Sequence, residues 1–206
     1  MNLFVEGFAL QAGLILGLGA QNIFVLDCGI RRNHHNLIAA VCSLCDFLLI
    51  LLGVLGAASV FIAVPILKII FGVLGVSFLA YYALKKLLEA YRNKFDQQHS
   101  LEKKFSAQRA IILSLGFSLL NPHVYLDTVI LIGGYASKYE ALDARLYFGL
   151  GASIFSVLWF FSLANLSAYL GPVLTKPKAM RIVSLCAGIV LSILSYKLSR
   201  EVLSWL

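Results

Sequence analysis

Two apolar runs with helix-breaking residues recur at corresponding places in the two halves of this chain, and they limit how it can fold. The first is GLGAQNIFVLD, from Gly17 to Asp27, and the second is GFSLLNPHVYLD, from Gly116 to Asp127. Each run holds a side-chain amide and an acid in an otherwise apolar stretch, where a charge is costly and usually marks a pathway or a site. Matched broken segments in two halves are typical of transporter binding sites.

The composition indicates that a lipid bilayer is the solvent for most of the chain. Hydrophobic residues make up 60% of the 206 residues and charged residues 13%, whereas soluble domains average about 45–50% apolar and about 25% charged residues. The net charge of +7 is compatible with nucleic-acid binding in principle. However, the basic residues lie between apolar runs, so we interpret them as topology signals and expect no nucleic-acid partner.

Six candidate membrane spans follow from the need for about 20 apolar residues per helix. They are 8–26, 37–64, 66–84, 110–134, 146–170 and 182–196. The last is short, and it can be extended to Leu206 because Lys197 and Arg200 can reach the interface with their long side chains. Pro65 separates the second run from the third, and Gly171-Pro172 ends the fifth. The spacing Gly13-x-x-x-Gly17 predicts close packing of the first span.

The polar stretch 85–109 divides the spans into three plus three. An odd number of spans per half gives the halves opposite orientations in the membrane, which is an inverted repeat. We therefore predict an all-α integral membrane protein with six transmembrane helices in two three-helix inverted repeats. They would form one membrane domain over 1–206, with halves of about 1–90 and 110–206 and a cytoplasmic connecting loop at 85–109.

The distribution of basic residues predicts the orientation. Twelve of the 17 Lys and Arg residues lie in three loops, 27–36, 85–109 and 171–181. The positive-inside rule places these loops in the cytoplasm and both termini outside, and we expect the basic loops to contact membrane lipids. The first six residues include no Lys or Arg, which argues against a cleaved signal peptide.

Two acids stand alone in predicted spans and are the main candidates for function. Asp46 is the only charged residue in 37–64, and Asp127 is the only acid in 110–134. Each needs a partner in the membrane, while Lys68 and Lys197 lie near span ends and can reach the interface. We expect the two acids to lie close enough to share one cation or one proton. The structural alternative is that each acid bonds to a neighbouring helix.

Polar residues around these acids complete the candidate site. Pro122 lacks an N–H and frees backbone carbonyls that protein, water or ligand must satisfy; a simple proline kink is the structural alternative. The amides of the first run can bind a substrate or join helices. The residues predicted to bind substrate or couple protons are Asp46, Asp127, Asn121, Pro122, Tyr125, His123, Gln21 and Asn22. Asp27 precedes Arg31 by four residues, and we interpret it as part of a surface ion pair.

Other chemistries have weaker support. Cys42 and Cys45 form a CxxC spacing that would suit a membrane thiol-redox carrier, but a nearby carboxylate at Asp46 disfavours thiolates, and packing is the preferred interpretation. His34 and His35 have no Cys/His cluster with which to hold a metal. We expect no enzyme activity, because no phosphate-binding loop or Ser-His-Asp set is recognisable, and neither cofactor nor metal.

The motifs together resemble the lysine/arginine exporter family, LysE/ArgO, and are most similar to its arginine-exporter branch. The matching stretches are GAQNIFVLDCGIRRNHH, CDFLLILLGVLG, NPHVYLDTVILIGG and LWFFSLA, spread over nearly the whole chain. Where the family usually has proline before Gln-Asn, this chain has Ala20, which predicts a less sharp break in the first span. The resemblance implies Asp46 and Asp127 as intramembrane acids and export of basic amino acids from a bacterial cytoplasm.

The resemblance and the acids predict a secondary exporter of L-arginine in the cytoplasmic (inner) membrane. L-lysine and toxic analogues such as canavanine are further candidate substrates. A carboxylate can hold either a proton or a cation, so proton uptake or the membrane potential is the expected driving force. An exporter of another amino acid or metabolite and the thiol-redox carrier stay open as alternatives, as does a homodimer.

Overall fold

The structure is a computed structural model that describes residues 2–17, 19–56, 65–91, 105–121, 124–174 and 176–205. Within these ranges every regular element is a helix, which confirms the predicted all-helical class for this part of the chain. In chain order the helices are α1 (Leu3–Ile15), α2 (Ala20–Ile30), α3 (His35–Val54), α5 (Pro65–Tyr91), α6 (Ala107–Leu119), the π-helix η1 (Tyr125–Ile132), α8 (Gly133–Ala136), α9 (Leu142–Leu174) and α10 (Pro177–Trp205).

Three of the described helices are long and apolar enough to cross a membrane. They are α3, α9 and the part of α10 from Lys178 to Ser204, and the bent pair α1 and α2 would be a fourth span. Helix α6 and the segment Tyr125–Ala136 are shorter apolar helices. The chain is therefore a multi-pass membrane protein, while the count of six spans stays a prediction.

The first predicted span, 8–26, is broken sharply. Helices α1 and α2 meet at 80°, so the expectation that Ala20 would soften the break is wrong. The reason lies in the side chain of Asn22, whose Nδ2 donates hydrogen bonds of 2.7 Å to the carbonyl oxygens of both Ile15 and Gly17. These carbonyls lie where α1 ends, and that of Gly17 also accepts a hydrogen bond from the Gly19 N–H at 2.8 Å. The Asn22 amide thus helps to satisfy the backbone carbonyls that the break exposes.

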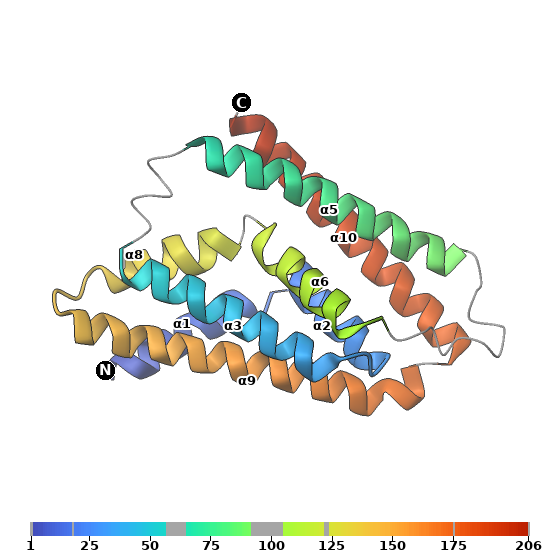
Figure 1. Cartoon of the computed structure of the whole chain (residues 1–206), viewed down its shortest axis with the longest axis horizontal. Helices are drawn as coiled ribbons and strands as arrows, with labels where there is room; N and C mark the ends of the chain where they lie inside the picture. Colours follow the sequence, from blue (N-terminus) through green and yellow to red (C-terminus); the bar gives the residue numbers. More distant parts are fainter. Residues whose placement is uncertain are drawn as a thin grey trace.

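The predicted fourth span, 110–134, is also divided, between α6 and the π-helix η1. Each half of the chain thus contains a broken helix followed by two long helices. Figure 1 shows that α3 and α9 run antiparallel along each other, and that α5 and α10 do the same. This order and these directions are those that an inverted repeat requires, and the repeat itself stays a prediction.

The helix ends gather at two opposite ends of the molecule. In Figure 1 the end of α2, the start of α3, the end of α5, and the junction of α9 with α10 lie toward the right. The N-terminus, the end of α3, the start of α5 and the junction of α8 with α9 lie toward the left. The three loops predicted to be cytoplasmic are attached to helix ends on the right.

The fifth predicted run does not end at Gly171-Pro172, because α9 continues to Leu174 with Pro172 inside it. Proline removes the N–H that would bond to the carbonyl four residues earlier, here that of Ala168. Arg32 donates from Nε to this oxygen at 3.1 Å. The arginine thus supplies the missing donor and lets the helix continue.

Glycines allow several helices to approach closely, though not at the predicted spacing. Among the described residues, no atom outside its own helix backbone lies within 4 Å of a Cβ built on Gly13, so this part of the chain does not show the close contact predicted for Gly13-x-x-x-Gly17. The contact of α1 with α9 is made instead by Gly7 and Gly151, where an added Cβ would overlap backbone atoms of the facing helix. A Cβ on Gly53 of α3 would lie 2.8 Å from the carbonyl oxygen of Thr128 in η1.

An aromatic cluster joins α2, α5 and α6 on the side of the molecule away from α1. The ring centroids of Phe24 and Phe117 lie 4.5 Å apart and stack, and the Tyr82 ring meets Phe117 edge-on at 4.7 Å. Aromatic pairs at these separations are favourable beyond the area that they bury. The cluster positions α2 and α6, the two helices whose ends flank the candidate site.

Candidate functional site

The candidate site is a cavity of about 320 Å³ that opens at the breaks in both halves of the chain. Its walls come from α1, α2, α3, α5, α10 and η1, together with Asn121 and Val124 between α6 and η1. Five of the eight predicted site residues line it: Gln21, Asn22, Asp46, Asn121 and Asp127. Ligand cavities in proteins occupy about 300–1,000 Å³, so this volume suits a small metabolite.

Asp46 lies on α3 and is 2% exposed. Its Oδ2 accepts a hydrogen bond from the Ser156 hydroxyl at 3.0 Å and lies 3.5 Å from Gln11 Nε2. Gln11 Nε2 also donates to Ser156 Oγ at 2.7 Å, so α1, α3 and α9 are joined around this carboxylate. Asp46 Oδ1 and Gln11 Oε1 are buried without a hydrogen-bond partner among the described residues. The free oxygen of this carboxylate can therefore accept a hydrogen bond from a ligand in the cavity.

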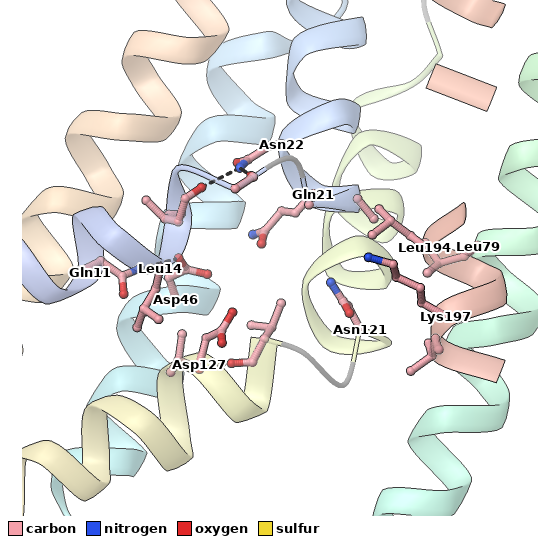
Figure 2. Close-up of a pocket in the computed structure, with 17 residues that line it drawn as sticks. Gln11, Leu14, Gln21, Asn22, Asp46, Leu79, Asn121, Asp127, Leu194 and Lys197 are labelled. Atoms are coloured by element: carbon pink, nitrogen blue, oxygen red, sulfur yellow. Dashed lines mark hydrogen bonds between the residues drawn. The ribbon is translucent and has the colours of Figure 1, made fainter. Parts of the chain in front are cut away.

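Asp127 lies in the π-helix η1, and its carboxylate faces the cavity on the same side as that of Asp46 (Figure 2). A run of π-helix is rare and occurs frequently at functional sites, because its wider turns redirect side chains. Thr128, the next residue, also lines the cavity and donates from Oγ1 to the carbonyl oxygen of Val124 at 2.6 Å. The two lone acids predicted from the sequence therefore share one cavity.

The amides of the first run bind protein as well as lining the cavity. Gln21 Nε2 donates to the Ser118 hydroxyl at 2.9 Å and links α2 with α6. Asn22 satisfies the carbonyls at the end of α1, and its Oδ1 accepts a hydrogen bond from Trp159 Nε1 at 3.1 Å. These contacts agree with the alternative that the amides join helices, while binding of a substrate by them stays a prediction.

Of the three remaining predicted residues, only Tyr125 is described, and it is not among the residues that line the cavity. The Tyr125 hydroxyl donates to the carbonyl oxygen of Leu119 at 2.7 Å and so caps the end of α6. This hydrogen bond links the start of η1 to the end of α6, and contact of Tyr125 with a ligand stays a prediction. Pro122 and His123 lie outside the described residues.

Four polar residues of the site were not predicted from the sequence: Gln11, Thr128, Ser156 and Lys197. Gln11 and Ser156 are uncharged polar residues inside apolar runs, and such residues are common at helix contacts. Lys197, which was expected to reach the membrane interface, is exposed and also lines the cavity; Figure 2 shows its ammonium group beside Asn121, across from Asp46 and Asp127. A helical pattern could have suggested it, because Leu194 and Leu198 on the same face of α10 also line the cavity.

Asp27 belongs to a buried charge network, which corrects the expectation of a surface ion pair. The predicted pairing with Arg31 is present at 3.2 Å, but Asp27 is 6% exposed and its Oδ2 lies 2.7 Å from Lys86 Nζ. Glu89 Oε2 accepts from Lys86 Nζ at 3.0 Å and from an Arg31 guanidinium nitrogen at 3.2 Å. Two acids and two bases thus join α2 to α5, and Arg31 also contacts Ser184 of α10 at 3.5 Å.

A second, more exposed charge cluster lies toward the opposite end of the molecule. Glu6 Oε2 accepts hydrogen bonds from the Tyr139 hydroxyl at 2.7 Å, from Lys138 Nζ at 3.1 Å and from the Tyr135 hydroxyl at 3.2 Å. The Lys138 ammonium lies 3.7 Å from the centre of the Tyr135 ring. The cluster ties the start of α1 to the segment between η1 and α9.

The thiols of the CxxC spacing are buried in the helix bundle. Cys42 is 0% exposed and Cys45 is 5% exposed, and both are free thiols. Redox cysteines need access to water and to a reaction partner. Burial therefore favours packing as their role.

His34, the residue before α3, has a left-handed backbone with φ 50° at the turn out of α2.

Comparisons with known proteins agree with the sequence motifs. The LysE type translocator family matches residues 12–201. The arginine exporter protein ArgO of Yersinia enterocolitica is 37% identical over 198 residues, which is 96% of this chain and 96% of the relative. The proteins of the same name from Salmonella enteritidis and Salmonella typhimurium are 38% and 37% identical, over 96% of this chain and 93% of each relative. No solved structure matches the chain.

Proposed function

Because the chain belongs to the LysE type translocator family, we propose that it exports L-arginine across the inner membrane of a bacterium as a secondary transporter. The chain is a multi-pass membrane protein, and the family and its arginine-exporter relatives make it an amino-acid exporter. L-arginine is the substrate that the names of these relatives give. L-lysine and canavanine are further candidates, because both carry a basic side chain.

The observation that supports this proposal best is the pair of carboxylates on one cavity wall. Asp46 and Asp127 face the same cavity, and Asp46 Oδ1 has no hydrogen-bond partner among the described residues. A guanidinium group presents a planar set of donors that fits carboxylates with two hydrogen bonds, whereas an ammonium group is a compact point charge. We infer that the pair binds the cationic side chain and favours arginine over lysine.

The orientation of the transporter follows from its basic helix ends. We propose that the loops 27–36, 85–109 and 171–181 are cytoplasmic, that both termini face outward, and that six spans form two inverted repeats. The antiparallel pairs in Figure 1 support this arrangement. In such folds the substrate lies between the repeats, near the broken helices, and rocking of one repeat against the other exposes it to each side in turn.

Proton uptake is the coupling that we propose. Moving one positive charge outward against 100 mV costs about 2.3 kcal/mol, and uptake of one proton cancels that charge movement. A carboxylate can hold a proton on the inward path and a cation on the outward path. Asp46 and Asp127 are the candidate exchange groups, because both face the cavity.

Transport by purified protein in lipid vesicles tests the proposal. Labelled arginine, lysine and a neutral amino acid are compared, each with and without an imposed proton gradient. We expect arginine to be moved fastest and to be accelerated by the gradient. Equal transport of the neutral amino acid would instead favour the alternative of an exporter with another substrate.

The two acids are tested in the same vesicles. Asp127→Asn and Asp46→Asn keep the shape of the side chain but lose its charge and its proton, so each should abolish arginine transport while the protein still inserts. Asp143→Asn serves as the control, since Asp143 is an acid in the exposed first turn of α9. Normal transport by Asp127→Asn would mean that this acid is structural.

The thiol-redox alternative has its own test. A double variant, Cys42→Ser with Cys45→Ser, should keep nearly all arginine transport, because both thiols are buried and neither lines the cavity. A redox carrier would lose all activity in this variant. Loss of arginine transport with normal folding would therefore assign chemistry to the thiols.

A further inference from the structure

Lys197 is a cation in the candidate cavity without an assigned role. It lies on α10 in the second half of the chain, lines the cavity, and makes no hydrogen bond or ion pair within the described ranges. Figure 2 shows its ammonium group directed toward Asn121, on the side of the cavity opposite Asp46 and Asp127. An ammonium group kept apart from the acids of its own cavity is available to an anionic group of a ligand.

The start of α2 lies on the wall of the same cavity. Gly19, its N-cap residue, makes no side-chain cap hydrogen bond, and Gly19, Ala20 and Gln21 line the cavity. The first-turn N–H groups of a helix have no acceptor within the helix, and the helix dipole makes this end favourable for an anion. In Figure 2, Gln21 lies between the acids and Lys197, so the start of α2 lies on the wall between these two groups of charges.

The charges on the wall complement one class of molecule. Among the described lining residues, the charged side chains are two acids and one base, Asp46, Asp127 and Lys197. A basic α-amino acid carries two cations, on the side chain and the α-amino group, and one anion, the α-carboxylate. A decarboxylated amine or a polyamine lacks the anion that Lys197 would bind, and a neutral amino acid lacks the second cation.

We propose that Lys197, supported by the start of α2, binds the α-carboxylate of the transported amino acid, while Asp46 and Asp127 bind its cationic groups. The inference rests on the proposed function and adds the recognition of the backbone of the substrate. It makes α10 of the second half a direct participant in binding. It also predicts selection against basic amines, which lack the carboxylate and which an acidic cavity alone would accept.

Binding of two ligands to purified full-length protein tests the proposal. The ligands are L-arginine and L-arginine methyl ester, which keeps both cations and loses the negative charge of the carboxylate. A hydrogen bond to a charged group contributes about 1.5–3 kcal/mol, which is roughly a 10-fold to 150-fold change in affinity. We expect the unmodified protein to bind arginine more tightly than the ester by a factor in this range.

Three variants separate the possible outcomes. Lys197→Gln should bind arginine as weakly as the ester while its affinity for the ester stays unchanged, which also shows that the variant is folded. Lys197→Arg should keep a preference for arginine. Lys178→Gln changes a lysine at the start of the same helix that does not line the cavity, and it should behave as the unmodified protein does.

The inference and the proposed function fail in different ways. If Lys197→Gln keeps the full preference for arginine over the ester, Lys197 does not bind the carboxylate, and the inference is wrong. If the unmodified protein binds neither ligand, the proposed function is wrong, and the inference falls with it. Asp46→Asn gives a further check, because it should weaken both ligands by similar factors and leave the preference between them intact.

Discussion

Arg32 Nε lies 3.1 Å from the carbonyl oxygen of Ala168, the acceptor that Pro172 leaves without its helical donor. The bond connects the turn after α2 to the last part of α9. Beside it, Gly171 lets the carbonyl of Ile30 come so close that a Cβ there would lie 2.7 Å from its oxygen. The GIRR segment therefore has a structural role at the end of the molecule where we place the cytoplasmic loops.

A double-mutant cycle should reveal the coupling of Arg32 to Pro172. Arg32→Met removes the donor and leaves the Ala168 carbonyl unsatisfied, which should destabilise the protein by about 1–3 kcal/mol. Pro172→Ala restores the helical N–H, so Arg32→Met should cost clearly less in that background. Thermal unfolding of the four proteins in detergent measures the difference. Equal effects of Arg32→Met in both backgrounds would show that Ala168 is not the acceptor that matters.

The ion pair of Asp27 with Lys86 should matter for stability more than other ion pairs of the chain. Both residues are less than a tenth exposed, and Lys86→Met leaves two acids of the network, Asp27 and Glu89, to share the single charge of Arg31. A buried charge left uncompensated costs about 3–5 kcal/mol, so Lys86→Met should lower the unfolding temperature strongly. Asp27→Asn combined with Lys86→Met should be less harmful than Lys86→Met alone, because it leaves one acid, Glu89, for the one base, Arg31.

Lys138→Met is the matched control for this pair. Its ion pair with Glu6 has a similar length, 3.1 Å, but the Lys138 side chain is 46% exposed. Exposed pairs contribute about 0–1 kcal/mol, so the control should unfold nearly as the unmodified protein does. Equal destabilisation by Lys86→Met and Lys138→Met would mean that burial does not set the strength of the Asp27 pair.

Two glycines offer opposite expectations for the same substitution. Gly151→Ala places a Cβ against the Phe4 carbonyl and should push α1 away from α9, with loss of stability. Gly13→Ala, in α1, adds a Cβ with no contact within 4 Å among the described residues, so it should be neutral or stabilising by about 0.5–1 kcal/mol, because alanine favours the helix. The unfolding temperatures of the two variants test this, since only that of Gly151→Ala should fall below that of the unmodified protein. A harmful Gly13→Ala would indicate a contact of this face with lipid or with a second copy.

The sequence was sufficient to predict those site residues that stand out within a single apolar run. Lone acids, amides and helix breakers in apolar runs identified Asp46, Asp127, Gln21 and Asn22 as lining residues, since such groups are costly in lipid unless they face a cavity or a partner. It could not predict Gln11 and Ser156, because a single amide or hydroxyl costs little in a helix contact. Their position beside Asp46 depends on how α1 and α9 pack, which no spacing within one run determines.

Lys197 and Asp27 show the same limit for charged residues. A lysine near a span end can extend to the interface or turn inward, and only the packing of α10 against α5 and α2 decides between them. Asp27 and Arg31 are four residues apart and were predicted to pair, but Lys86 and Glu89 join them from a helix far away in sequence. A local pattern therefore predicts an ion-pair partner within the same helix, whereas partners from other helices depend on tertiary packing.

Cysteine labelling in intact cells tests the predicted topology. Single cysteines are placed by Ser137→Cys, in the turn after α8, and by Ser100→Cys, in the predicted cytoplasmic loop and outside the described residues. The background lacks the natural cysteines, of which Cys186 is exposed. A membrane-impermeant thiol reagent should label Ser137→Cys from outside and Ser100→Cys only after the membrane is opened. The two positions are separated by the fourth span alone, so three spans per half require them on opposite sides of the membrane. Labelling of both positions from the same side would contradict the inverted repeat, since the segment from α6 to α8 would then enter and leave the membrane on one face.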